Sequence, residues 1–149
     1  MRSTPLALAL GFVAAAVIVV ATFLPWQETP LNGEVSGISS GGWAPAILAL
    51  IAGFNLLAWK TTGKVRDAWV AAACGAFAAI ASGYLIYDFS TRTEGLFEES
   101  STSDPRIGGY VALVGALVLM ASALMLARSA PTAAALRGDG PPPPPPPPR

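Results

Sequence analysis

Few side chains in this 149-residue chain are suited to catalysis or to binding a metal ion. Histidine is absent and Cys74 is the single cysteine, so neither an internal disulfide nor a zinc cluster can form. Histidine is also the commonest acid and base in enzymes, and the serine-rich segments lack a neighbouring base that would activate a hydroxyl group. We therefore predict that the protein is not an enzyme and that it holds no catalytic, metal or cofactor site.

Carboxylates and tyrosines gather around one segment, residues 84–99. Several oxygen ligands are what a hard cation such as calcium requires. The spacing of these side chains matches no calcium-binding loop, so we interpret the segment as a solvated acidic loop. Its members are Tyr84, Tyr87, Asp88, Glu94, Glu98 and Glu99.

Asn55 is the one strongly polar side chain well inside an apolar run. An amide buried in lipid needs a hydrogen-bond partner, and either Ser82 or a backbone carbonyl would provide one. The alternative is that Asn55 lines a polar path in a small transporter or channel subunit. Ionisable side chains usually mark such paths, and the middle of each apolar run has none. We therefore favour a role in helix packing.

Eight consecutive prolines, residues 141–148, precede the C-terminal Arg149. Polyproline adopts an extended left-handed helix that cannot pack a core, and such segments dock onto aromatic grooves of the SH3 and WW kind. We expect Pro141, Pro144, Pro147 and Arg149 to contact a cytoplasmic protein. The alternative is that this tail serves only as a spacer.

Four apolar runs dominate the rest of the chain, at residues 6–25, 43–59, 68–87 and 107–127. The chain is 53% hydrophobic and 12% charged, whereas soluble domains are about 25% charged. Each run is long enough to cross a hydrocarbon core of about 30 Å as a helix. The first is also longer than the apolar region of a cleaved signal peptide. We predict an all-α fold: a four-helix transmembrane bundle over residues 1–128 and a disordered proline-rich tail over 129–149.

Basic residues indicate the orientation of this bundle. If the spans alternate, seven of the nine Lys and Arg residues fall on one side, which is the pattern of a cytoplasmic face. We therefore place both termini in the cytoplasm and the bundle in the plasma (inner) membrane. The four tryptophans lie near the predicted ends of the spans, where aromatic residues suit the headgroup layer. The seven basic residues are Arg2, Lys60, Lys64, Arg66, Arg128, Arg137 and Arg149.

Small residues recur at helical spacing and predict where the helices approach each other. Gly75, Ala79 and Gly83 repeat every four positions in the third run, and Gly108 and Gly115 repeat at seven in the fourth. We expect packing within one chain, with a homo- or hetero-oligomer as the alternative. Between the first two runs, residues 27–42 are rich in Gly and Ser and predict a flexible or strand-like loop.

Two short motifs resemble a known group of membrane proteins. They are Phe23-Leu24-Pro25-Trp26, before a Gly/Ser loop, and Gly108-Gly109-Tyr110 followed by residues 113–117. Over residues 1 to about 128 the chain is similar to small four-span proteins of actinobacteria, with the tryptophan-associated transmembrane proteins as the nearest named set. The resemblance implies a membrane location, no established activity and no catalytic residues. The layout is also similar to that of claudin-like proteins, whose loop cysteines are missing here.

These observations predict a non-enzymatic accessory or scaffolding protein of a bacterial plasma membrane. Its proline-rich tail would recruit a cytoplasmic partner, and its acidic outer loops would contact a component of the envelope. The expected surroundings are the lipid bilayer, and no nucleic-acid partner is expected. The rival function is that of a small transporter or channel subunit.

Overall fold

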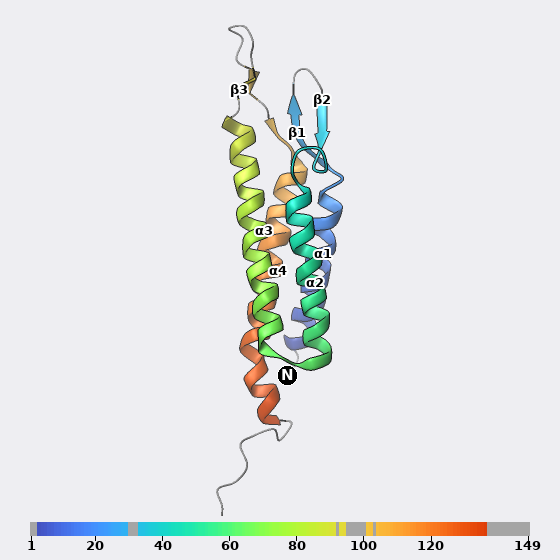
Figure 1. The fold of residues 1–149 in the computed structure, drawn as a ribbon, viewed down its shortest axis with the longest axis vertical. Helices are drawn as coiled ribbons and strands as arrows, with labels where there is room; N and C mark the ends of the chain where they lie inside the picture. Colours follow the sequence, from blue (N-terminus) through green and yellow to red (C-terminus); the bar gives the residue numbers. More distant parts are fainter. Residues whose placement is uncertain (1–2, 30–32, 92, 95–100, 103, 137–149) are drawn as a thin grey trace, which may run out of the picture.

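A computed structural model describes residues 3–29, 33–91, 93–94, 101–102 and 104–136 of the chain. Its four long helices lie along one axis as a bundle (Figure 1). They are α1 (Ser3–Ala21), α2 (Trp43–Thr62), α3 (Val65–Thr91) and α4 (Ile107–Leu136). Each helix is long and apolar enough to cross a membrane. The prediction of a helical protein built on four apolar helices is confirmed.

The helices pack in a ring, in which α1 and α3 each contact both α2 and α4. The most extensive contacts join α4 to α3 and to α1, whereas α1 and α2 touch least among these four pairs. A tight turn joins α2 to α3, where Gly63 adopts a left-handed conformation (φ 67°) and its N–H bonds to the Trp59 carbonyl at 2.8 Å. Glycine adopts this conformation without a steric penalty, and the turn therefore aligns α2 and α3 as an antiparallel hairpin.

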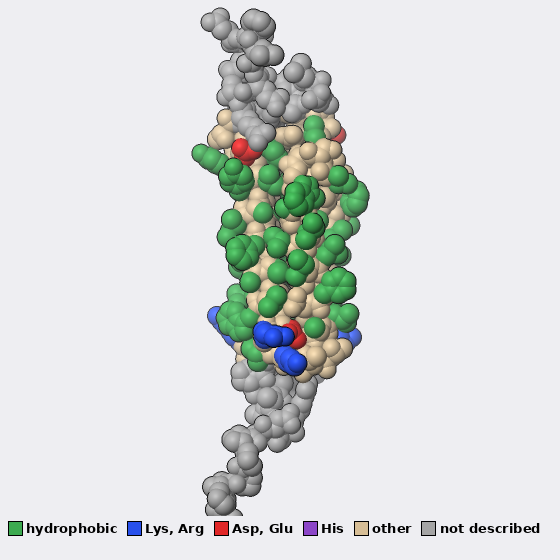
Figure 2. Space-filling view, in the orientation of Figure 1, with side chains coloured by type: hydrophobic (Ala, Val, Ile, Leu, Met, Phe, Trp, Pro, Cys, Tyr) green, Lys and Arg blue, Asp and Glu red, His purple; other side chains and the backbone are tan. Residues whose placement is uncertain are grey.

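Small side chains fill the interior of the bundle, and large apolar side chains cover its outside. Many of the buried core positions are alanine, and the fully buried larger residues include Ile18, Leu56 and Leu119. Phe54 and Ile80 instead point outward, with 72% and 67% of their surface exposed. Figure 2 shows hydrophobic side chains spread over the middle of the molecule and Lys and Arg gathered at its lower end. This distribution is typical of helices that pack closely in lipid.

The helix ends differ from the predicted ones at several places: α1 begins and α2 ends three residues beyond the predicted runs, and α3 extends three and four residues beyond its run. α1 ends at Ala21 instead of residue 25, because Thr22, Phe23 and Leu24 form a turn before the proline that begins the next strand. α4 continues to Leu136 instead of ending at residue 127. Residues 129–136 were expected to belong to the disordered tail, but the helix continues through Pro131 into the alanine-rich residues 133–135, which favour it. Residues 137–149 lie outside the described part of the chain.

Short strands cap one end of the bundle. They are β1 (Pro25–Thr29), β2 (Gly33–Ser36), β3 (Thr93–Glu94), β4 (Ser101–Thr102) and β5 (Asp104–Pro105). β1 lies between β2 and β5 in an antiparallel sheet, while β3 pairs with β4. Residues 27–42 were predicted to form a flexible or strand-like loop, and part of this loop forms strands β1 and β2. Through β1 and β5, the loop after α1 is joined to the start of α4.

Candidate functional site

Trp26 is the centre of the cap at the strand end of the bundle. It lies on β1, only 1% of its surface is exposed, and its indole Nε1 donates a hydrogen bond to the Ala21 carbonyl at 2.7 Å. Three glycines surround the ring: a Cβ at Gly37, Gly42 or Gly108 would lie 2.5–2.9 Å from an indole atom. Such distances are too short for a real side chain, so these glycines provide the space that the indole occupies.

The loop over Trp26 is held by hydrogen bonds between backbone groups. The Gly37 and Ile38 N–H groups bond to carbonyls of the turn after α1, at 3.2 and 3.1 Å. The Gly42 N–H bonds to the Gly37 carbonyl at 2.6 Å and closes the loop on itself. Phe89 from α3 and Ala112 from α4 pack with Trp26 in a small core of their own. The cap is thus an ordered unit with its own hydrophobic centre.

The tryptophans divide into two pairs, a division that was not predicted. Trp43 and Trp69 are 57% and 55% exposed, as expected for residues that face headgroups. Trp26 and Trp59 are buried, at 1% and 9%. The expectation that Trp26 faces the headgroup layer is therefore wrong, because the glycine-rich loop folds over it. The glycines of the loop that follows Trp26, among them Gly37 and Gly42, are the sequence signal that would have indicated this.

A row of acidic residues crosses the sheet of the cap. Glu28 on β1 lies in register with Glu34 on β2 and with Asp104 on β5. The carboxylates of Glu28 and Glu34, directly opposite one another, repel, and an ion pair from Arg106 to Glu28 offsets part of this repulsion. The backbone N–H of Arg106 also bonds to the Trp26 carbonyl at 2.8 Å. The charged edge and the aromatic core are thus held by the same short segments.

The small residues predicted to mediate helix packing lie in different surroundings. At Gly75 a Cβ would lie 2.8 Å from the Met120 backbone nitrogen, and at Gly115 it would lie 2.9 Å from Ile18, so both are sites of close helix approach. Ala79 is partly buried against the bundle core. Gly108 packs against Trp26 of the cap. Gly83 differs, because a Cβ there would meet no atom within 4 Å, and it makes no close approach within the chain.

Asn55 does not pair with Ser82. Its amide nitrogen donates to the Ile51 carbonyl of its own helix at 2.8 Å, which is the backbone-carbonyl alternative. Ser82 is fully buried in α3 and its hydroxyl has no hydrogen-bond partner among the described residues. Asn55 therefore satisfies its amide within α2, and the structure does not bring these two side chains together.

The opposite end of the bundle carries basic residues around the α2–α3 turn. Lys60, Lys64 and Arg66 are exposed there. Asp67 is buried and accepts a hydrogen bond from the Thr62 hydroxyl at 3.0 Å, with the Arg66 Nε 3.7 Å from its carboxylate. The Thr62 hydroxyl and Arg66 compensate the buried carboxylate of Asp67. The ammonium groups of Lys60 and Lys64 remain exposed to solvent.

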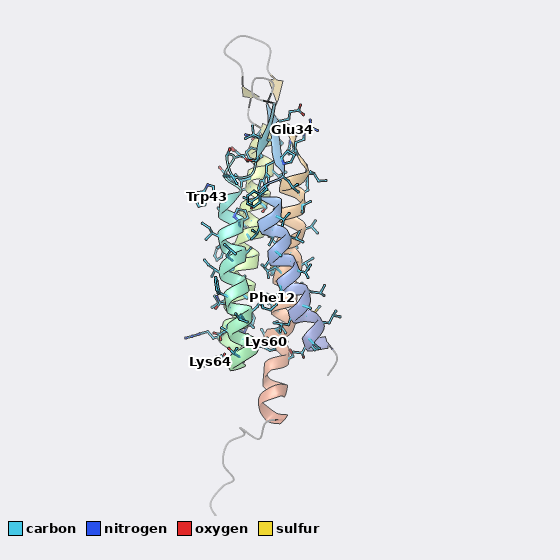
Figure 3. The ribbon with its side chains drawn as sticks, turned by 90° about the vertical axis from the view of Figure 1, so that its right-hand side faces the viewer. Phe12, Glu34, Trp43, Lys60 and Lys64 are labelled. Carbon is cyan, nitrogen blue, oxygen red and sulfur yellow. The ribbon has the colours of Figure 1, made fainter. Side chains whose placement is uncertain are left out.

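Two apolar grooves run along the outside of the bundle. One lies between α1 and α4 and has a volume of about 430 Å³, and the other lies between α1 and α2 and has a volume of about 480 Å³. A smaller hollow of about 310 Å³ lies between the start of α1 and Arg128 of α4. Figure 3 shows the face of the molecule that carries the α1–α2 groove, with Phe12 and Lys60 on it.

Several predicted residues lie outside the described part of the chain. They include the tail residues Pro141, Pro144, Pro147 and Arg149 and the loop residues Glu98 and Glu99. Within the described ranges, no group of three or more His, Cys, Asp or Glu side chains is placed to hold a metal ion. Cys74 is buried in α3 among small residues of the bundle core.

Comparisons with known proteins do not extend these observations. No protein-family model, curated protein or solved structure matches this chain. The arguments about function therefore rest on the sequence and the geometry described above.

Proposed function

We propose that the protein is a four-span scaffold of the bacterial plasma membrane, with both termini in the cytoplasm and no enzymatic activity. Its tail recruits a cytoplasmic protein, and its acidic cap contacts a component of the envelope. The four apolar helices support the location, since each matches the thickness of a bilayer. The excess of Lys and Arg at the end opposite the cap supports the orientation.

The observation that carries the recruitment proposal is the length of α4. This helix continues nine residues past Ala127, where the apolar run ends, or about 13 Å at 1.5 Å per residue. Figure 1 shows that the C-terminal end of α4 extends beyond the adjacent ends of its three neighbours. The helix would therefore hold the start of the proline-rich segment away from the membrane surface, where a soluble domain has room to bind.

The packed interior of the bundle supports a scaffold more than a transporter or channel subunit. Its core positions are filled by alanine and by packed residues such as Ile18 and Leu119. A polar path would depend on Asn55, but its amide nitrogen donates a hydrogen bond to the Ile51 carbonyl of its own helix. These features make the role of a transporter or channel subunit the weaker proposal.

A pull-down from gently solubilised membranes tests the proposal. The full-length chain with an N-terminal tag is compared with a chain truncated after Arg137, and bound proteins are identified by mass spectrometry. We expect a cytoplasmic protein that is retained by the full chain and lost on truncation. The identity of that protein would also report on which side of the membrane the tail lies.

A matched variant tests whether partner binding depends on the polyproline helix or only on the length of the tail. In it, residues 141–148 are replaced by eight alternating Gly and Ser residues, which keep a tail but remove the preformed extended helix. We expect the same loss of partner as on truncation, with unchanged sedimentation in the membrane fraction. Equal recovery of all proteins from the three chains would reject recruitment by the tail.

A further inference from the structure

The groove between α1 and α2 opens where the bundle is least tightly closed. Its volume is about 480 Å³, and it is lined only by apolar residues of the two helices. Ala15 and Ala49 are buried at its base, and Gly53 adds no side chain at all. A Cβ built on Gly53 would meet no atom within 4 Å. Small residues thus leave room along this face that larger side chains would fill.

A lysine stands at the basic end of this groove. Lys60 lies three residues after Leu57 and seven after Gly53, both of which line the groove, so the three share one side of α2. A helical side chain covers the turn on the N-terminal side of its own Cα, which here is the mouth of the groove. Figure 3 shows Phe12 and Lys60 on this face, with Lys60 nearer the basic end. Within the described ranges, Lys60 makes no ion pair.

The dimensions of the groove correspond to one leaflet of a bilayer. From Leu50, near its upper end, to Lys60 is ten helical residues, or about 15 Å. Half of a hydrocarbon core of about 30 Å has the same depth. A lipid whose phosphate lies at Lys60 would therefore extend an acyl chain along the whole groove.

We propose that this groove binds one acyl chain of an anionic phospholipid from the leaflet at the basic end of the bundle, with the Lys60 ammonium group on its phosphate. The inference rests on the proposed membrane insertion. An ordered acyl chain supplies the contacts that the groove-lining atoms otherwise lack. The lysine, a compact point charge on a flexible apolar stem, selects the anionic headgroup.

The test measures phospholipid retained by the full-length chain. The protein is reconstituted into phosphatidylcholine vesicles with or without phosphatidylglycerol, released in mild detergent and examined by native mass spectrometry. We expect one retained phosphatidylglycerol per chain. Lys60→Gln should weaken its retention about tenfold, the effect of losing one hydrogen bond to a charged group. Lys64→Gln, at the same end, serves as the control and should change retention little.

A second pair of variants tests the groove itself. Gly53→Leu places a side chain in the groove, where its Cβ would meet no atom within 4 Å, and should reduce phosphatidylglycerol retention about tenfold, by displacing apolar contacts of the acyl chain. Gly83→Leu is the matched control, because Gly83 is equally open but does not line the groove. Thermal unfolding of each variant verifies that the bundle is intact.

Three results would overturn the proposal. Equal effects of Lys60→Gln and Lys64→Gln would mean that attraction to anionic lipid is diffuse, and unchanged retention in Gly53→Leu would mean that the groove is not the site. A dimer that Gly53→Leu abolishes would assign the groove to a second copy of the chain. Flotation of the protein with the vesicles separately reports membrane insertion, so a failure of that premise is distinguishable from a failure of the lipid site.

Discussion

The cap and the bundle beneath it obtain their stability in opposite ways. In the cap, one large side chain, Trp26, is surrounded by three glycines and held by a hydrogen bond from its own indole. In the bundle, many small side chains each bury little area and let the helix backbones come close. We infer that the cap concentrates its stability at one residue, whereas the bundle distributes it over many. Substitutions should therefore have unequal effects in the two regions.

The largest expected effect is that of Trp26→Ala. Removal of a buried tryptophan leaves a cavity and typically costs about 3 to 5 kcal/mol, so the cap should lose its fixed structure. The control is Trp43→Ala, which removes a tryptophan that is 57% exposed and should change the stability much less. Unfolding in a detergent mixture, followed by circular dichroism and tryptophan fluorescence, measures both. Equal losses for the two variants would show that the cap is not built around Trp26.

A smaller effect is expected from Gly75→Ala at the contact between α3 and α4. The added methyl group would lie 2.8 Å from the Met120 backbone nitrogen, so the two helices must move apart, at a cost of about 1 to 3 kcal/mol. Gly83→Ala is the matched control: its Cβ has free space, and alanine favours the helix by up to about 1 kcal/mol. The two midpoints of thermal unfolding should shift in opposite directions. A shift of the same sign and size would indicate that Gly75 is not a close contact.

The smallest effect concerns the charged edge of the cap. Glu28 and Arg106 are both 42% exposed, and ion pairs of this kind contribute about 0.5 kcal/mol. Arg106→Gln should destabilise the cap more than Glu28→Gln, because the first leaves Glu28 and Glu34 without a cation and the second relieves their repulsion. A double-mutant cycle at low and high salt measures the coupling. Salt should reduce the difference between the variants, and a difference independent of salt would exclude charge as its cause.

Much of the bundle was predictable because lipid imposes a strong constraint. A helix that crosses a membrane must satisfy its backbone internally, so apolar runs of sufficient length and their flanking charges reveal it. The close approaches at Gly75 and Gly115 were also visible as small residues at helical spacing. At Gly83 the same spacing was misleading, because a repeat of four drifts by about 40° per step around a helix of 3.6 residues per turn, so Gly83 no longer shares the face of Gly75.

The cap was much harder to predict. Its core depends on contacts between segments far apart in the chain: Gly37 in the first loop and Gly108 at the start of α4 both meet Trp26. A tryptophan beside a predicted span suits the headgroup layer as well as a small core, and only the fold of the loop decides between them. The extension of α4 to Leu136 was missed because the nearby prolines suggested disorder.

The length of α4 has a consequence for stability. One helix begins beside Trp26, passes Ile18 at Gly115 and ends beyond the basic face of the bundle. One continuous helix thus takes part in the packing of both ends of the bundle. We therefore expect a substitution that loosens the packing around Trp26 to alter the stability of α4 as far as the basic end of the bundle.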